Sequence, residues 1–264
     1  MKTIHNKSFY ILLITLITFF SCSKENGEFL YNKRMITVSI SGYNASENTL
    51  EVKIDTITVE QTIGRNNPIN FGAAYTFSDD QKEIEMTITE KESGKIVLEK
   101  TLIKGSDPIK LSYLYLEGKL HDFPIIPPKE DGKIRVQYIY MPKNLEYKGP
   151  VDIAFGKYYL TPKVYVEFAR LKNVKPFEVS ESISFDTFST VGQTYNGQPT
   201  ATFFRAYLYK AGTNEFVTAG TSYNWNLLSS AVPVPSATSA SSKFFIFSDY
   251  IYNNNIMFSK NLEL

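Results

Sequence analysis

The chain has 264 residues with 28 basic and 27 acidic side chains, so its formal net charge is +1 at neutral pH. It has no basic run of the kind that replaces phosphate counterions, which excludes nucleic acid as an expected partner. Only two histidines and one cysteine occur, so we expect no metal, no cofactor, no catalytic triad and no thiol nucleophile.

The first 21 residues have the organisation of a secretory signal peptide. Lys2 and Lys7 form a basic head, an apolar run of about a dozen residues ends at Phe20, and the small Ser21 precedes Cys22. A membrane span needs about 20 apolar residues, and polar residues follow Cys22 at once, so we expect cleavage rather than a span. Cleavage removes two lysines and no acidic residue, which leaves the mature chain near neutrality.

The residues around Cys22 resemble a lipobox, the signal for lipid attachment to a cysteine. The segment reads Phe19-Phe20-Ser21-Cys22, whereas the usual box prefers leucine at the position of Phe19. The resemblance implies cleavage before Cys22, acylation of that cysteine with palmitate and related chains, and anchorage in a membrane. Ser23 stands where aspartate would favour the inner membrane, so the resemblance implies the outer membrane and leaves its two faces open. We expect residues 22–31 to be a tether.

Alternation of apolar and polar residues with a period of two predicts strands in the first half of the mature chain. It is clearest over residues 36–41, 50–55 and 83–89. Gly94 can supply the positive φ of a hairpin loop, so the strands on either side of it are expected to pair. These elements predict an N-terminal domain over residues 32–121.

A proline-rich segment interrupts this pattern, and similar strands resume after it. Prolines cannot donate to a sheet ladder, so residues 122–132 are predicted to link the first domain to a second at 133–264. Alternation returns over residues 134–141, 163–168 and 203–209, and Ser229–Ser242 is predicted to be a long surface loop before a buried strand at 244–247. The sequence therefore predicts an all-β protein with two antiparallel β-sandwich domains in tandem, of the immunoglobulin or transthyretin kind.

Catalytic candidates are few. His121 lies just before the proline-rich segment and is expected to be solvated. A hydrolase of the glycosidase type needs only two carboxylates, and the candidates are Asp79, Asp80, Asp152, Glu167, Glu178, Glu181 and Asp186. Spacing alone brings no two of them together, so we do not expect an enzyme.

Aromatic abundance is the positive feature, with 18 tyrosines, 19 phenylalanines and a single tryptophan. An outward tyrosine on a strand offers a flat ring and a hydroxyl to a sugar, or it packs under another part of the fold. The candidate ligand-binding residues are Tyr165, Arg205, Tyr207, Tyr209 and Trp225.

The lipobox-like cysteine and the aromatic β-rich chain together resemble a Bacteroidetes-type outer-membrane or surface lipoprotein. The resemblance implies partners at the membrane, through the lipid, and a glycan or another surface protein. Our first hypothesis is a non-enzymatic binding lipoprotein for glycans. The alternative is a structural or adhesive subunit of the fimbrial type, in which a detachable first strand such as Met35–Gly42 pairs between chains. A carboxylate-dependent hydrolase is the third hypothesis.

Overall fold

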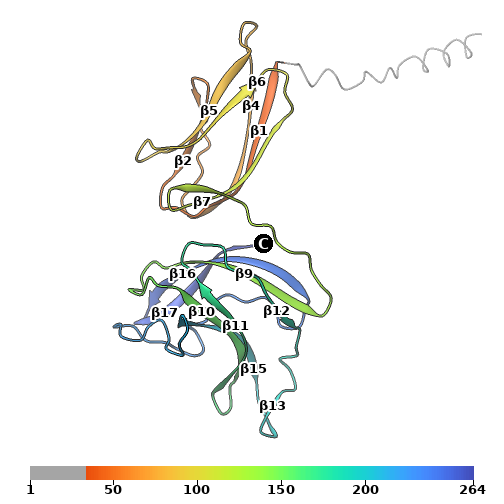
Figure 1. Ribbon diagram of the computed structural model, residues 1–264, viewed down its shortest axis with the longest axis vertical. Helices are drawn as coiled ribbons and strands as arrows, with labels where there is room; N and C mark the ends of the chain where they lie inside the picture. The colour runs from red at the N-terminus through yellow and green to blue at the C-terminus, as the bar shows by residue number, and fades with distance from the viewer. Residues whose placement is uncertain (1–33) are drawn as a thin grey trace, which may run out of the picture.

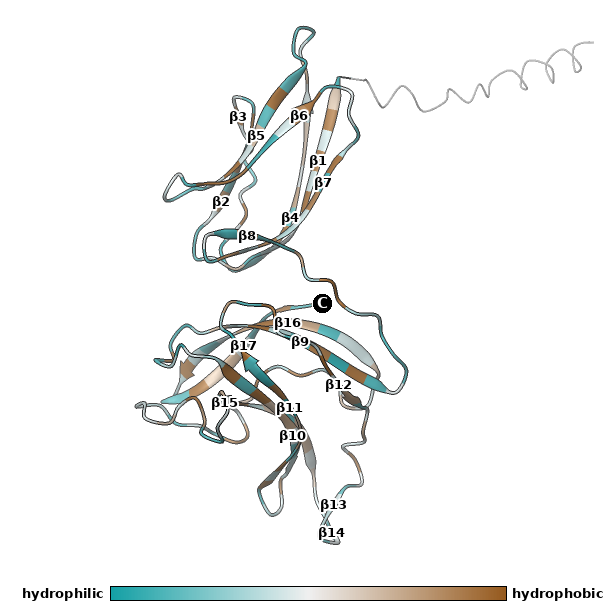
Figure 2. Ribbon diagram, viewed as in Figure 1, coloured by the Kyte–Doolittle hydropathy of each residue, from teal (hydrophilic) through white to brown (hydrophobic). Residues whose placement is uncertain are grey.

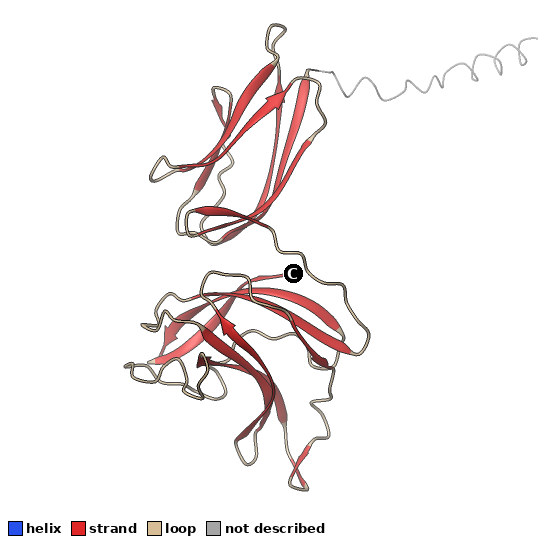
Figure 3. Ribbon diagram, in the orientation of Figure 1, coloured by secondary structure: helices blue, strands red, loops and turns tan. Residues whose placement is uncertain are grey.

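The computed structural model describes residues 34–264, which form β-strands joined by turns and loops (Figure 3). The predicted signal peptide, Cys22 and the tether lie outside the described residues. Among residues 34–264, none belongs to a helix of the length and apolarity that a membrane span requires. Two β-sandwiches follow one another along the chain (Figure 1), which confirms the predicted all-β tandem fold.

The N-terminal sandwich consists of two 4-stranded sheets, with strand orders β4-β1-β7-β8 and β3-β2-β5-β6. Its strands are β1 (Met35–Asn44), β2 (Leu50–Ile54), β3 (Ile57–Thr58), β4 (Asn67–Thr76), β5 (Glu83–Glu90), β6 (Ile96–Ile103), β7 (Ile109–Leu116) and β8 (Lys119–Asp122). Gly94 has φ +69° in the predicted hairpin between β5 and β6. Apolar and polar residues alternate along the strands, as the brown and teal bands show (Figure 2). The apolar residues of both sheets form one buried core.

Strand β1 lies in the interior of its sheet. It pairs with β4 on one side and, in parallel, with β7 on the other, and its residues Ile36, Val38 and Ile40 are at most 2% exposed. Withdrawal of the predicted detachable strand would therefore break two ladders and open the core.

The C-terminal sandwich combines a 3-stranded sheet, β11-β10-β15, with a 4-stranded sheet, β12-β9-β16-β17. Its strands are β9 (Lys133–Met141), β10 (Val151–Tyr159), β11 (Val164–Val174), β12 (Ile183–Asp186), β13 (Thr194–Tyr195), β14 (Gln198–Pro199), β15 (Thr202–Lys210), β16 (Ser241–Tyr252) and β17 (Asn255–Glu263). Phe155, Phe204, Phe245 and Phe247 are among the residues that fill its core.

The two sandwiches share a strand order, which periodicity in the sequence does not reveal. In each, the first strand lies inside a four-stranded sheet and pairs in parallel with a late strand, β1 with β7 and β9 with β16. In the second sheet, β10 corresponds to β2 and β15 to β5, but the C-terminal sheet has no counterpart of β6. The long connection between β15 and β16 occupies that side instead, through isolated bridges of Phe216 and Val232 to β15.

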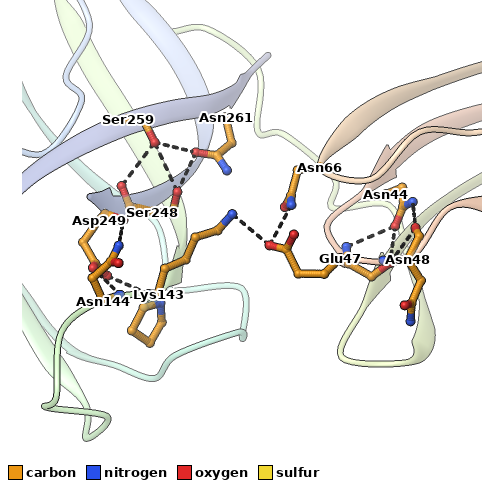
Figure 4. Close-up of polar contacts among 12 residues, drawn as sticks. Asn44, Glu47, Asn48, Asn66, Lys143, Asn144, Ser248, Asp249, Ser259 and Asn261 are labelled. Carbon is orange, nitrogen blue, oxygen red and sulfur yellow. Dashed lines mark hydrogen bonds and ion pairs between the residues drawn. The ribbon is translucent and has the colours of Figure 1, made fainter. Parts of the chain in front are cut away.

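An apolar interface joins the sandwiches. Residues of β1 and β7 meet the outer face of the β9–β16 pair in a buried cluster: Tyr43, Leu114, Leu116, Ile139, Met141, Phe244 and Ile246. Beside this cluster, Lys143 Nζ lies 3.0 Å from Glu47 Oε1 (Figure 4). Buried Asp249 fixes the neighbouring loop, because its carboxylate accepts the backbone amides of Lys143, Asn144 and Leu145. The connecting residues 123–132 contain no strand.

Candidate functional site

Four of the predicted ligand-binding residues meet on the outer face of the β11-β10-β15 sheet. Tyr207 and Tyr209 lie opposite core residues of the same strand, as alternation requires. Tyr165 comes from β11, with its ring centroid 4.2 Å from that of Tyr207. Trp225 comes from the β15–β16 connection, 5.7 Å from the Tyr207 ring. The sequence therefore identified residues that do come together.

The Tyr207 and Tyr209 rings pack under another part of the fold, which is the second of the two alternatives for an outward tyrosine. Tyr207 is 0% exposed and Tyr209 is 9% exposed. The cause is the β15–β16 connection, which places Phe216 against Tyr209 with a centroid distance of 4.8 Å and stacks it on Trp225 at 4.5 Å. The cluster is a second small core on the outer face of the sheet.

Hydrogen bonds close this aromatic cluster. The Tyr165 hydroxyl donates to the Ala154 carbonyl at 2.6 Å, and the Tyr207 hydroxyl donates to the Leu227 carbonyl at 2.5 Å. Burial raises the pKa of both phenols, so both remain protonated at neutral pH. Arg205, the fifth predicted residue, is half-buried beside Phe203, at the end of β15 that the connection leaves uncovered.

Two of the carboxylate candidates meet around one arginine. Arg170 donates to both oxygens of Glu167, at 2.8 and 2.6 Å, and its Nη1 lies 3.6 Å from Asp152 Oδ2. These carboxylates raise the pKa of Arg170 further above its usual range. Together with Lys172 and Asn214 they line an open cleft of about 850 Å³. Because a paired guanidinium lies on both carboxylates, neither is placed to act as a free acid beside a free base.

The remaining catalytic candidates lie outside this cleft. Asp79 pairs with Arg34 at 2.7 Å and Asp186 with Lys133 at 2.8 Å, both at the surface. Glu178 and Glu181 line a smaller cleft next to Lys172. Asp80 accepts a hydrogen bond from the Ser78 hydroxyl, and His121 is exposed on β8. Within residues 34–264, no three His, Cys, Asp or Glu side chains converge as metal ligands.

An exposed tyrosine pair lies elsewhere, at the end of β16. Tyr250 is 41% exposed and Tyr252 is 62% exposed. They stand two residues apart on one strand and therefore share a face, about 7 Å from each other. Met257 on β17 is the cross-strand partner of Tyr250. The sequence does indicate this pair, because two tyrosines stand two residues apart just before Asn253-Asn254. The same spacing occurs at Tyr207 and Tyr209, so spacing alone does not distinguish the exposed pair from the buried one.

Hydrogen bonds hold the hairpin that carries Tyr250 and Tyr252. Asn253 and Asn254 take the left-handed conformation, with φ of 47° and 59°, as a two-residue hairpin turn requires. The Asn254 carbonyl accepts the Asn224 amide at 2.9 Å, and the Asn254 side chain donates to the Ser222 carbonyl at 3.1 Å. The β15–β16 connection thus braces the turn that follows Tyr252.

No protein-family model matches this chain, and neither does any curated protein. A candidate adhesin from Bacteroides ovatus matches with 6% identity over 86% of this chain and 92% of its own, at a TM-score of 0.23. A candidate cell adhesion protein from Bacteroides ovatus ATCC 8483 has 9% identity over 86% and 96%, with a TM-score of 0.20. A candidate polysaccharide binding protein from Bacteroides thetaiotaomicron has 7% identity over 86% and 95%, with a TM-score of 0.19. At such TM-scores the likeness carries no conclusion about the activity of this chain.

Proposed function

We propose that this protein is a lipid-anchored, non-enzymatic binding protein of the bacterial outer membrane, and that it binds glycans through Tyr250 and Tyr252. The observation that carries the proposal is the exposure of two tyrosine rings on one face of a braced hairpin. Aromatic rings of this kind stack on the apolar faces of sugars while the hydroxyls form hydrogen bonds. A platform that hydrogen bonds already hold in place also loses less conformational entropy when a ligand binds.

The position of β1 supports display of this platform away from the membrane. Tyr43, near the end of β1, lies in the interface with the C-terminal sandwich, whereas Met35 lies at the opposite end of the strand (Figure 1). A ten-residue strand is about 30 Å long. A tether that runs from Cys22 to Met35 therefore reaches the N-terminal sandwich at its far end, with the C-terminal sandwich beyond it.

The arrangement of charges favours binding over hydrolysis. Asp152 and Glu167 share the larger cleft, and Arg170 pairs with both. A glycosidase pair needs one protonated and one ionised carboxyl group on either side of the scissile bond, whereas these two carboxylates lie around one arginine.

Glycan binding by the mature protein and its single-alanine variants tests the proposal. Tyr250→Ala and Tyr252→Ala should each weaken binding by about 1 kcal/mol or more while the melting temperature stays nearly unchanged, because both rings are exposed. Ile251→Ala is the matched control, since Ile251 is 40% exposed on the same hairpin but points to the other face.

The proposal fails if a broad glycan panel gives no binding to the folded mature protein. It also fails if Ile251→Ala weakens binding as much as the tyrosine variants do, because the loss would then come from the hairpin and not from the rings. No binding at all would leave the structural or adhesive subunit as the better hypothesis.

A further inference from the structure

Arg205 lies where the C-terminal sandwich lacks a strand that the N-terminal sandwich has. Strand β5 pairs with β2 and β6, whereas its counterpart β15 pairs along its length only with β10. The β15–β16 connection fills part of the open edge, because the Ala206 and Leu208 carbonyls accept the amides of Val232 and Val217. The next carbonyl along this edge, that of Phe204, accepts Nη1 of the Arg205 side chain at 3.1 Å.

The guanidinium of Arg205 has no carboxylate partner among residues 34–264. Its bond to Phe204 is the one hydrogen bond found for its five N–H groups in this part of the chain, and its Nε is buried without a partner. Burial lowers the pKa of Arg205. The carboxylate of Glu167, on the same sheet face across Gly156, is already held by Arg170. A half-buried cation in this position favours an anion from outside the chain.

An exposed aromatic ring adjoins this cation. The Arg205 guanidinium carbon lies 5.0 Å from the ring centroid of Phe203, and Phe203 is 36% exposed. Leu227, whose carbonyl accepts the Tyr207 hydroxyl, is also 36% exposed on this face of the sheet. The site thus combines an apolar surface with one unpaired planar cation.

We propose that Arg205 and Phe203 bind a sugar that carries a carboxylate, a hexuronate unit of an acidic glycan. The carboxylate accepts hydrogen bonds from the outer nitrogens of the guanidinium, whose planar fork matches its geometry. The pyranose ring packs on Phe203. This site goes beyond the Tyr250–Tyr252 platform, since it lies on the other sheet of the sandwich and adds selection by charge.

Titration of the mature protein with glucuronate, glucose and inorganic sulfate tests this site. Glucuronate should bind about tenfold or more tightly than glucose, because a charge-assisted pair forms only with the acid. Arg205→Met should abolish this preference while it keeps most of the apolar stem. Arg135→Met is the matched control, since it removes the same charge from a residue that already pairs with Glu130 at 3.3 Å, and it should leave the preference intact.

The Nε–Hε signal of Arg205 in the NMR spectrum of the wild-type protein gives a readout that needs no variant. Glucuronate should shift this signal, and glucose should not. The proposal is overturned if the two sugars bind equally, if Arg135→Met has the same effect as Arg205→Met, or if the Arg205 signal stays unmoved. Sulfate that binds as tightly as glucuronate would reduce the site to an anion site without sugar recognition and overturn it too. Tyr250→Ala and Tyr252→Ala should leave the preference for glucuronate over glucose unchanged, because neither ring carries a charge, so this site and the platform can fail independently.

Discussion

The substitution Tyr207→Ala separates packing from ligand binding at the aromatic cluster. Tyr207 is 0% exposed and lies against Tyr165, Phe216 and Trp225 with centroid distances of 4.2, 6.0 and 5.7 Å. Truncation of a large buried aromatic side chain to alanine lowers the free energy of unfolding by about 3–5 kcal/mol, through lost transfer energy and the cavity that remains. Loss of the hydrogen bond from the Tyr207 hydroxyl to the Leu227 carbonyl alone lowers the free energy of unfolding by about 1 kcal/mol.

These magnitudes predict a graded series of melting temperatures. One kcal/mol corresponds to about 3 °C for a protein of this size. Tyr207→Phe should therefore lower the melting temperature of the C-terminal sandwich by about 3 °C and Tyr207→Ala by about 10 °C or more. Tyr252→Ala is the control, because Tyr252 is 62% exposed and its truncation should change stability by less than about 0.5 kcal/mol.

Calorimetry measures the melting temperature, and tryptophan fluorescence measures the exposure of the aromatic cluster. Trp225 is the single tryptophan of the chain, so its emission reports directly on the cluster. When Tyr207→Ala is heated, the Trp225 emission should shift towards that of solvated indole. This shift should occur at or below the melting temperature of the C-terminal sandwich. Equal melting temperatures for Tyr207→Ala and Tyr252→Ala would refute the reasoning, since the covering connection would then contribute nothing to stability.

Three further predictions concern the anchor, the linker and one buried carboxylate. Cys22→Ser should move the protein from the detergent phase to the soluble fraction without unfolding it, because stable attachment depends on the acyl chains; equal partitioning of mutant and parent would contradict the lipoprotein proposal. Limited proteolysis should cut first within 129–133, where the chain is mostly exposed and contains no strand before Lys133; stable fragments that end elsewhere would contradict the proposed linker. Hydrogen bonds from Ser93 and Tyr115 lower the pKa of Glu90, so its contribution to stability should be present above about pH 4 and lost as the pH falls below that value. Urea unfolding at several pH values should show a weaker dependence on acid in Glu90→Gln than in the parent, and equal dependence would contradict this account.

Much of the fold could be predicted from the sequence, because burial of one face of a strand makes apolar and polar residues alternate along it. The alternation at Ile36, Val38 and Ile40 identified the inner face of β1, and Gly94 identified the β5–β6 hairpin. The parallel pairings of β1 with β7 and of β9 with β16 left no such trace. Alternation states which side of a strand is apolar, and it carries no information about which strand lies next to it.

The candidate site shows the same limit more sharply. Tyr207-Leu208-Tyr209 on β15 and Tyr250-Ile251-Tyr252 on β16 have the same local pattern, yet the first pair of tyrosines is buried and the second exposed. The difference arises from the connection between the two strands, which takes the place of a strand beside β15 and covers its outer face before it braces the turn after Tyr252. Exposure of an outward tyrosine is thus decided by chain segments distant in sequence. Tyr250 and Tyr252 lie next to the polar Asn253-Asn254 turn, which the connection braces but does not cover, and this pair is therefore free to contact a ligand.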